Sequence, residues 1–191
     1  MMRWMLRRWL ARFERQWNYD AGYMRDMIDA SPRAARMFAR ATAIGQFRED
    51  VPLEASFAAG ITAVRHEDCG PCTQLAVTMA ERAGVSAATL RALLADDPGN
   101  MPADVALAWR FTRATLAHDP AADDYREVIL DRWGRRALVS LAFSMTAARM
   151  YPTVKYALGH GKACMRVVVD GKPVVMDHGR ARPAAVATGA A

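Results

Sequence analysis

Two cysteines three positions apart, Cys69 and Cys72, are the residues best suited to chemistry in this chain of 191 residues. They flank a Gly-Pro pair in the stretch "RHEDCGPCTQLAVTMAERAG", which covers residues 65–84. Two thiols at this spacing can form a reversible disulfide, supply half of a metal site, or lie inert in a core. The residues around them and the elements that position them decide among these chemistries.

The residues just before the thiols can change how easily a thiol loses its proton. If Cys69 begins a helix, both sulfurs lie near unsatisfied backbone N–H groups and the positive end of the helix dipole, which favour the thiolate. Glu67 and Asp68 oppose this effect unless they point away or are neutralised by Arg65. His66 lies three residues before Cys69 and could accept the thiol proton. We therefore predict a catalytic set of Cys69, Cys72 and His66.

A metal at the dithiol would need further ligands, because structural zinc takes four. His66, Cys164 or His160 would have to complete the site. Cys164 is more simply a small buried residue, or a partner in disulfide exchange. His118, His160 and His178 stand in loop-like contexts, and we assign them no role. The sequence also contains no glycine-rich loop that would hold phosphates, so we expect neither a metal nor a cofactor.

Apolar residues recur at helical spacing through most of the chain, which predicts an all-α fold. The first helix carries a stripe of Met5, Trp9, Phe13 and Trp17, with arginines on its other faces. We expect this stripe to pack on its own domain or on another subunit rather than on a membrane surface. The arginines are spread along the chain without a recognised motif, so nucleic-acid binding is not expected.

The helices around the dithiol have apolar faces, and their ends carry capping signals. Ser31 and Ser86 predict N-caps, and Gly84 predicts the end of the helix that the cysteines begin. Later helices are predicted over 102–117, 123–133 and 135–150. The helix over 52–66 presents Leu53, Phe57, Ile61 and Val64 on one face, and the helix after the cysteines presents Leu75, Met79 and Ala83 as its inner face.

The pattern changes after Gly161, where "CMRVVVDGKPVVM" predicts a two-residue β-hairpin around Asp170-Gly171. A lone hairpin is only marginally stable, so it must pack on the helices or on another subunit. We divide the chain into an N-terminal amphipathic extension (1–30), a helical domain with the dithiol (31–160), the hairpin (161–179) and a disordered tail (180–191).

Composition bears on the location of the protein. The chain has a formal net charge of +6 and three cysteines, too few for a closed disulfide framework. Arginines interrupt the N-terminus before an apolar run of signal-peptide length can develop. No uncharged stretch is longer than residues 137–148, which are fewer than the ~20 residues that span a bilayer. We expect a cytoplasmic protein.

The region of residues 50–150 resembles the alkylhydroperoxidase D-like (AhpD-like, carboxymuconolactone decarboxylase superfamily) core, in which Cys-x-x-Cys begins a helix after another amphipathic helix. Thioredoxin also contains Cys-Gly-Pro-Cys, but there an aromatic residue usually precedes the motif and a β-strand leads into it. Here Asp68 precedes it, between helices. The resemblance implies hydroperoxide reduction, a dithiol reductant, Cys72 as the attacking thiol, and a homo-oligomer that is a trimer or a multiple of one.

The chain departs from the proton relay that the resemblance implies. Active relatives carry a histidine four residues after the second cysteine and a glutamate about a dozen before the first. Here these positions hold Ala76 and Phe57, and Glu54 lies about one turn farther back. Two functions follow: a thiol oxidoreductase acting on a hydroperoxide or disulfide, or a non-catalytic oligomeric helical protein with a structural or redox-sensing dithiol. His66 would favour Cys69 as the attacking thiol, so the order stays open.

Overall fold

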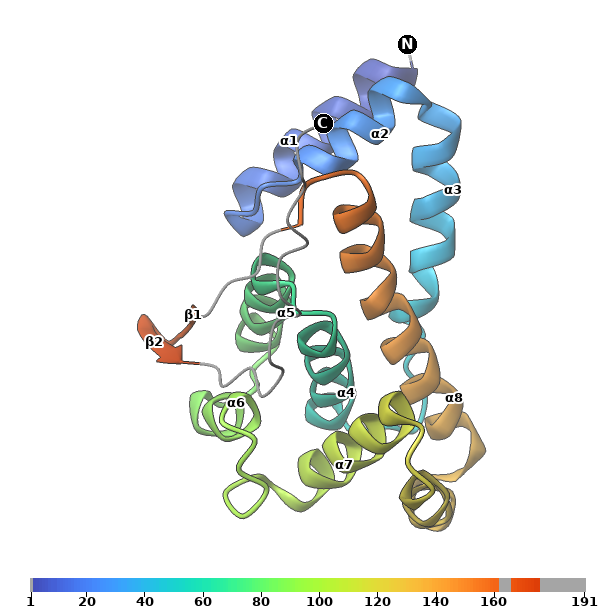
Figure 1. Cartoon of the computed structure of the whole chain (residues 1–191), viewed down its shortest axis with the longest axis vertical. Coiled ribbons are helices and arrows are strands. Elements are labelled where there is room, and N and C mark those ends of the chain that lie inside the picture. Colours follow the sequence, from blue (N-terminus) through green and yellow to red (C-terminus); the bar gives the residue numbers. More distant parts are fainter. Residues whose placement is uncertain (1, 162–165, 176–191) are drawn as a thin grey trace, which may run out of the picture.

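The computed structural model describes residues 2–161 and 166–175. Within them the prediction of an all-α fold with one small hairpin is confirmed (Figure 1). Cys164, His178 and the tail expected over 180–191 lie outside the described residues. The elements are α1 (Met2–Trp17), α2 (Gly22–Ala30), α3 (Pro32–Thr42), the short 3₁₀ helix η1 (Ala43–Gln46), α4 (Leu53–His66), α5 (Gly70–Arg82), α6 (Ala87–Leu94), α7 (Ala103–Ala117), α8 (Ala121–Ala157), β1 (Arg166–Val169) and β2 (Lys172–Val175).

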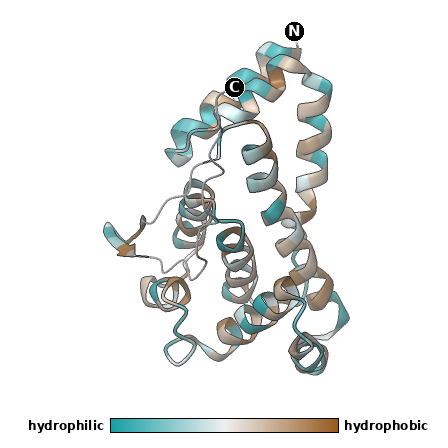
Figure 2. Cartoon of the chain, viewed as in Figure 1, coloured by the Kyte–Doolittle hydropathy of each residue, from teal (hydrophilic) through white to brown (hydrophobic). Residues whose placement is uncertain are grey.

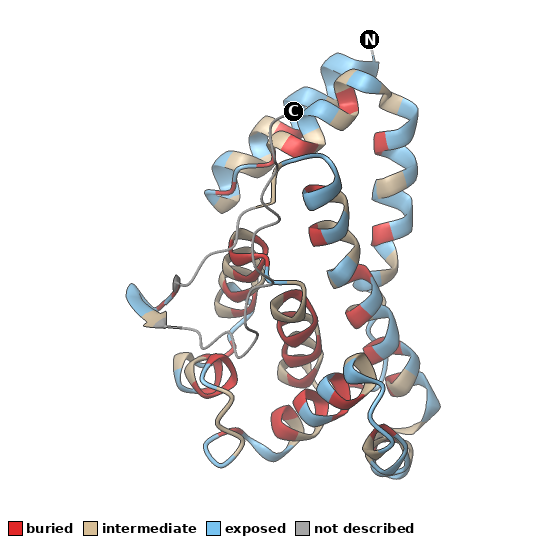
Figure 3. Ribbon diagram, in the orientation of Figure 1, coloured by how far each residue is buried: buried red, intermediate tan, exposed pale blue. Residues whose placement is uncertain are grey.

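Helix α4 lies at the centre of the molecule and packs against α5, α7 and α8. Its small residues let these neighbours approach closely, and most of the helix is buried (Figure 3). The helices α1, α2 and α3 form a second group at one end of the molecule, over the C-terminal part of α8 (Figure 1). This group has its own apolar cluster, which Leu75 of α5 and Tyr151 of α8 join to the rest.

Hydrophilic and hydrophobic residues alternate along α1, as the amphipathic pattern predicted (Figure 2). The buried face, however, differs from the predicted stripe. Leu10 is buried, and Leu6, Phe13 and Trp17 pack beside it, whereas Met5 and Trp9 are exposed. A strict four-residue spacing drifts around a helix of 3.6 residues per turn, so the inward face follows steps of three and four instead.

The predicted caps agree with the structure. The Ser31 hydroxyl accepts a hydrogen bond from the N–H of Ala34 at 3.2 Å, and the Ser86 hydroxyl accepts one from Thr89 at 3.0 Å. Gly84 follows α5 with φ of +97°, a conformation that glycine adopts without strain. These local signals fix where α3, α5 and α6 begin or end.

Helix α8 breaks at Gly134. This residue lies between the two helices predicted over 123–133 and 135–150, so the predicted break is confirmed. Gly134 has φ of +82° and ψ of 179°, in a region that only glycine occupies readily. The predicted end at residue 150 is wrong, because the second segment continues through the buried Pro152 to Ala157. Burial of this face outweighs the lost backbone hydrogen bond of the proline. The extension brings Lys155 into the interior.

The hairpin packs on the helices of its own chain. Asp170 and Gly171 both have positive φ, as the predicted two-residue turn requires. Val167 and Val169 are buried against α5 and α6. The Gln74 side chain bonds both backbone groups of Val168, at 3.0 Å from Nε2 to the carbonyl and 2.6 Å from the N–H to Oε1. A side chain thus satisfies one edge of the two-stranded sheet.

Candidate active site

The turn between α4 and α5 delivers both cysteines to the start of a helix. Asp68 has φ of +52°, which reverses the chain, and Cys69 then forms the extended N-cap of α5. Cys72 lies within the first turn, after Pro71. The predicted helix start is therefore confirmed. Cys69 is 1% exposed and Cys72 6% exposed, and both are free thiols that pack against Val64 at the end of α4.

The two thiols have opposite tendencies to ionise. Interaction with the Cys72 thiol lowers the pKa of Cys69 to about 7, although burial opposes it, and the Cys72 backbone N–H and the charge of Lys155 add to the effect. The same interaction and burial raise the pKa of Cys72. The pair therefore releases one proton easily and holds the second between the two sulfurs.

A buried lysine and a tyrosine complete the polar surroundings of the dithiol. The Tyr19 hydroxyl lies 3.7 Å from Cys72 Sγ, and Lys155 Nζ donates to that hydroxyl at 3.3 Å. Lys155 is 4% exposed and lies over the rings of Tyr19 and Tyr23, 4.8 and 5.5 Å from their centroids. Among the described residues it has no carboxylate within 4.0 Å. Burial raises the pKa of Tyr19, which keeps its phenol protonated.

The acidic residues before Cys69 do not have the ion-pair partner that the sequence suggested. Arg65 does not neutralise them, because it forms a two-pronged ion pair with Asp96 at 2.9 and 3.1 Å. Glu67 pairs instead with Arg149 at 2.5 Å. Asp68 still raises the pKa of Cys69, and its carbonyl accepts a hydrogen bond from Tyr156 at 2.7 Å. The favourable effects on the Cys69 thiolate exceed this opposition.

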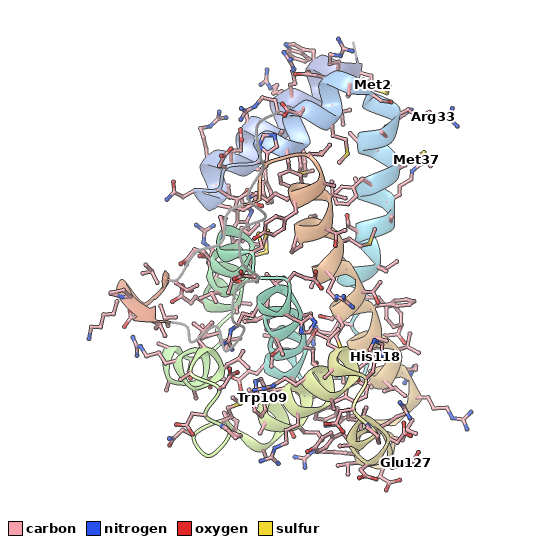
Figure 4. The ribbon with its side chains drawn as sticks, viewed as in Figure 1. Met2, Arg33, Met37, Trp109, His118 and Glu127 are labelled. Carbon is pink, nitrogen blue, oxygen red and sulfur yellow. The ribbon has the colours of Figure 1, made fainter. Side chains whose placement is uncertain are left out.

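The predicted proton acceptor His66 is the half-buried last residue of α4. Its role as proton acceptor stays a prediction. Tyr19, Lys155 and Asp68 act on the thiol pKa values. His118 is the C-cap residue that follows α7 (Figure 4). His160 bonds Asp26 at 2.6 Å and so ties the end of α8 to α2. No group of three possible metal ligands occurs in the part of the chain that the structure describes.

A cavity of about 570 Å³ opens beside the dithiol, and Cys72 lines it while Cys69 does not. It is mainly apolar and within the usual size range of small-molecule sites. The predicted face of α4 lines it over the length of the helix, and the cavity explains why Leu75 and Met79 of α5 are only half-buried. Ala83, predicted on the same inner face, is exposed. The inner face of α5 consists of Cys72, Thr73, Val77 and Ala80.

The two positions at which the resemblance expects a histidine and a glutamate both lie on this cavity. Ala76 and Phe57 occupy them and give the cavity an apolar wall. The polar groups near the thiols are instead the Tyr19 hydroxyl, which belongs to the cavity lining, and Lys155, which does not. Cys72 thus contacts both the mainly apolar cavity and the Tyr19 hydroxyl, which connects it to the buried lysine.

Comparison with known proteins adds no relative, because no family model, no curated protein and no solved structure matches the chain. Among the described residues, no helix has both the length and the apolar character needed to cross a bilayer. The site therefore has to be interpreted from its own geometry.

Sequence reasoning missed Lys155 and Tyr19. Both belong to segments far from the dithiol along the chain, and they lie 136 positions apart from each other. One signal was present: lysine is rare here, at three of 26 basic residues, and Lys155 follows Ala147 and Tyr151 at four-residue spacing on an apolar helix face. A charge on such a face indicates a buried functional group.

Proposed function

We propose that the chain is a dithiol oxidoreductase that reduces a hydroperoxide at Cys69 and Cys72. The observation that supports this most directly is the buried Lys155, linked through the Tyr19 hydroxyl to Cys72 by contacts of 3.3 and 3.7 Å. A buried cation without a carboxylate partner destabilises a fold, so a chemical role explains its presence. Its charge stabilises a thiolate, and the phenol can donate a proton.

In the first step Cys72 attacks, because it is the sulfur that faces the cavity. The proton of Cys72 moves to the Cys69 thiolate, and the Cys72 thiolate then attacks the outer oxygen of the hydroperoxide. The O–O bond breaks, Cys72 becomes a sulfenic acid, and the alkoxide leaves with the electron pair. Tyr19 donates a proton to the alkoxide, which becomes the alcohol. Lys155 then donates a proton to Tyr19 and takes one from water.

In the second step Cys69 attacks the sulfur of the sulfenic acid. The S–O bond breaks, the S–S bond forms, and the hydroxide leaves as water with the proton of Cys69. The substrate has then been reduced by two electrons and the dithiol oxidised to a disulfide. A dithiol reductant restores both thiols by exchange. His66 at the end of α4 stays a predicted acceptor for the thiol proton before the attack.

The second candidate is a redox-sensing dithiol without turnover. The apolar residues Phe57 and Ala76 at the expected relay positions favour it, as does the near-complete burial of Cys69. In this case peroxide would form the disulfide once, and a reductant would not sustain a cycle. Steady-state consumption of peroxide distinguishes the two candidates.

The test combines turnover with trapping of the sulfenic acid. With cumene hydroperoxide and a dithiol reductant, Cys69→Ser and Cys72→Ser should each abolish turnover, while Cys164→Ser should keep most of it. In Cys69→Ser, dimedone should label Cys72, as mass spectrometry would show. In Cys72→Ser, Cys69 should stay unlabelled because it does not line the cavity. Full turnover in the double variant would contradict the proposal, and labelling of Cys69 alone would reverse the order of attack.

The proposed assembly is a homo-oligomer, a trimer or a multiple of one. Its support is the exposed apolar side of α1, where Trp4 is 63% exposed, Met5 59% and Trp9 54%. Large apolar side chains exposed on a surface helix are typical of subunit contacts. Light scattering at micromolar concentration measures the assembly directly.

A further inference from the structure

We infer that the cavity beside Cys72 binds a long, single-chain carboxylic acid, with the carboxylate at Arg48 and the far end of the chain at the dithiol. The binding itself needs no redox chemistry, and only the claim that this acid is the substrate rests on the proposed function. The inference comes from the shape of the cavity, its one charged residue, and the distance between that residue and Cys72.

Among the described residues that line the cavity, Arg48 is the one with a charged side chain. Its Nη1 donates to the carbonyl of Val51 at 3.4 Å, and within the described residues it has no carboxylate within 4.0 Å. The adjacent Glu49 and Asp50 are directed to Arg136 instead, at 3.8 and 2.7 Å. The guanidinium is therefore available to an anion, and its planar fork suits a carboxylate.

Two hydroxyls of the lining are already bonded within the protein. Ser144 donates to the carbonyl of Ser56 at 3.2 Å, and Thr42 donates to the carbonyl of Phe38 at 3.0 Å. Most of the lining is apolar, so a ligand with many polar groups along its length would leave some of them unpaired. A hydrocarbon chain with one charged end matches this lining.

The length of the cavity follows from α4. Arg48 contacts Val51, just before the first residue of this helix, and Cys72 packs against Val64 near its last. The 14 residues of α4 span about 20 Å at 1.5 Å per residue. Leu53, Phe57, Gly60, Ile61 and Val64 line the cavity along that whole length. A chain anchored at Arg48 thus has to be long and extended to reach the sulfur.

The test measures binding under reducing conditions without peroxide, so its result does not depend on turnover. Saturated monocarboxylates of increasing length displace cis-parinaric acid, below their micellar concentrations. We expect affinity to rise about fourfold per added methylene until the cavity is filled. Methyl esters should bind about tenfold more weakly than the matching acids, because they lack the charge.

Two variants with a matched control locate the ligand. Arg48→Gln should remove the preference for acid over ester and leave ester affinity unchanged. Arg33→Gln, at an exposed arginine on α3 whose side chain points away from the body (Figure 4), should keep that preference. Ala148→Phe fills the cavity beside the thiols and should move the affinity maximum to shorter chains. Ala76→Leu tests the same point if the larger residue prevents folding.

Several results would overturn the inference. They are an affinity that does not change with chain length, an acid preference that survives in Arg48→Gln, or a probe that binds equally well in the filled variants. A cavity occupied by α1 of a second copy would give a flat length series and displacement that depends on protein concentration, and would also overturn it. If binding behaves as expected and peroxide turnover is absent, the proposed function fails and the binding site stands.

Discussion

Replacement of Lys155 by methionine tests the electrostatic account of the dithiol, because it removes the buried charge and keeps most of the volume. The two contacts of 3.3 and 3.7 Å place Nζ no more than about 7 Å from Cys72 Sγ. At an effective dielectric constant of about 20, two unit charges at that distance interact by about 2 kcal/mol. The interaction between the two thiols is the larger cause of the low pKa and persists in the variant.

We therefore expect Lys155→Met to lose about 1 kcal/mol of thiolate stabilisation. This change moves the pKa of Cys69 from about 7 toward 8 and lowers the thiolate fraction at neutral pH about threefold. The rate of alkylation of Cys72 by iodoacetamide, measured against pH, reports the shift without any peroxide, because the cavity reaches Cys72 and the two thiols share one proton. In the proposed mechanism peroxide turnover should fall further, because the variant also lacks the proton that Lys155 would supply through Tyr19.

The controls separate the local charge from the general effect of losing a lysine. Lys155→Arg keeps the charge and should keep the midpoint of the alkylation profile near that of the wild type. Lys172→Met makes the same substitution at an exposed lysine of β2 and should change nothing. Lys155→Met should also be as stable as the wild type or more so, since burying an unpaired charge is unfavourable. An unchanged alkylation midpoint in Lys155→Met would refute the electrostatic account.

Two further predictions concern stability. The pKa of Cys69 is lowered from 9.0 to about 7 on folding, so the reduced protein should gain stability as pH rises from about 7 to about 9, and lose it as pH falls through 7. Above pH 9 the raised pKa of Cys72 should reverse the trend. Denaturant titrations of the reduced protein should show both effects, and those of the disulfide form should show neither. A difference in unfolding free energy between the two forms that does not change with pH would contradict this prediction. Gly134→Ala should destabilise the protein by about 1–3 kcal/mol, because alanine is strained at φ of +82° and ψ of 179°. Gly99→Ala, with no positive φ and only an ordinary contact, should be near neutral, and equal denaturation midpoints for the two variants would count against strain at the break.

The parts of the fold that sequence reasoning predicted are those set by local chemistry. Ser31 and Ser86 cap helices through bonds to residues three positions ahead, and Asp170-Gly171 closes a turn within its own four residues. The helix start at Cys69 belongs to the same class. Such features need only short segments of chain, so their signals appear in the sequence.

The polar half of the candidate site depends on contacts between distant segments. Tyr19 lies after α1, and Lys155 lies beyond Pro152, where the sequence pattern predicted that α8 had already ended. Burial of the last turns of α8 overrides the proline, and that tertiary effect is what brings the cation to the thiols. The face of α4 was predicted correctly as apolar, but whether it meets another helix or a cavity depends on packing.

The contribution of Tyr19 and Tyr23 to this site bears on how the chain can be shortened. A fragment that begins at residue 31 would keep the whole Cys-Gly-Pro-Cys segment and every helix that contacts α4. It would nevertheless lack the phenol beside Cys72, one wall of the cavity, and the two rings that shield Lys155 from water. Proteolysis before α3 would thus leave the dithiol motif in the chain and change its surroundings. The first 30 residues contribute side chains to the candidate site, as the segment with the cysteines does.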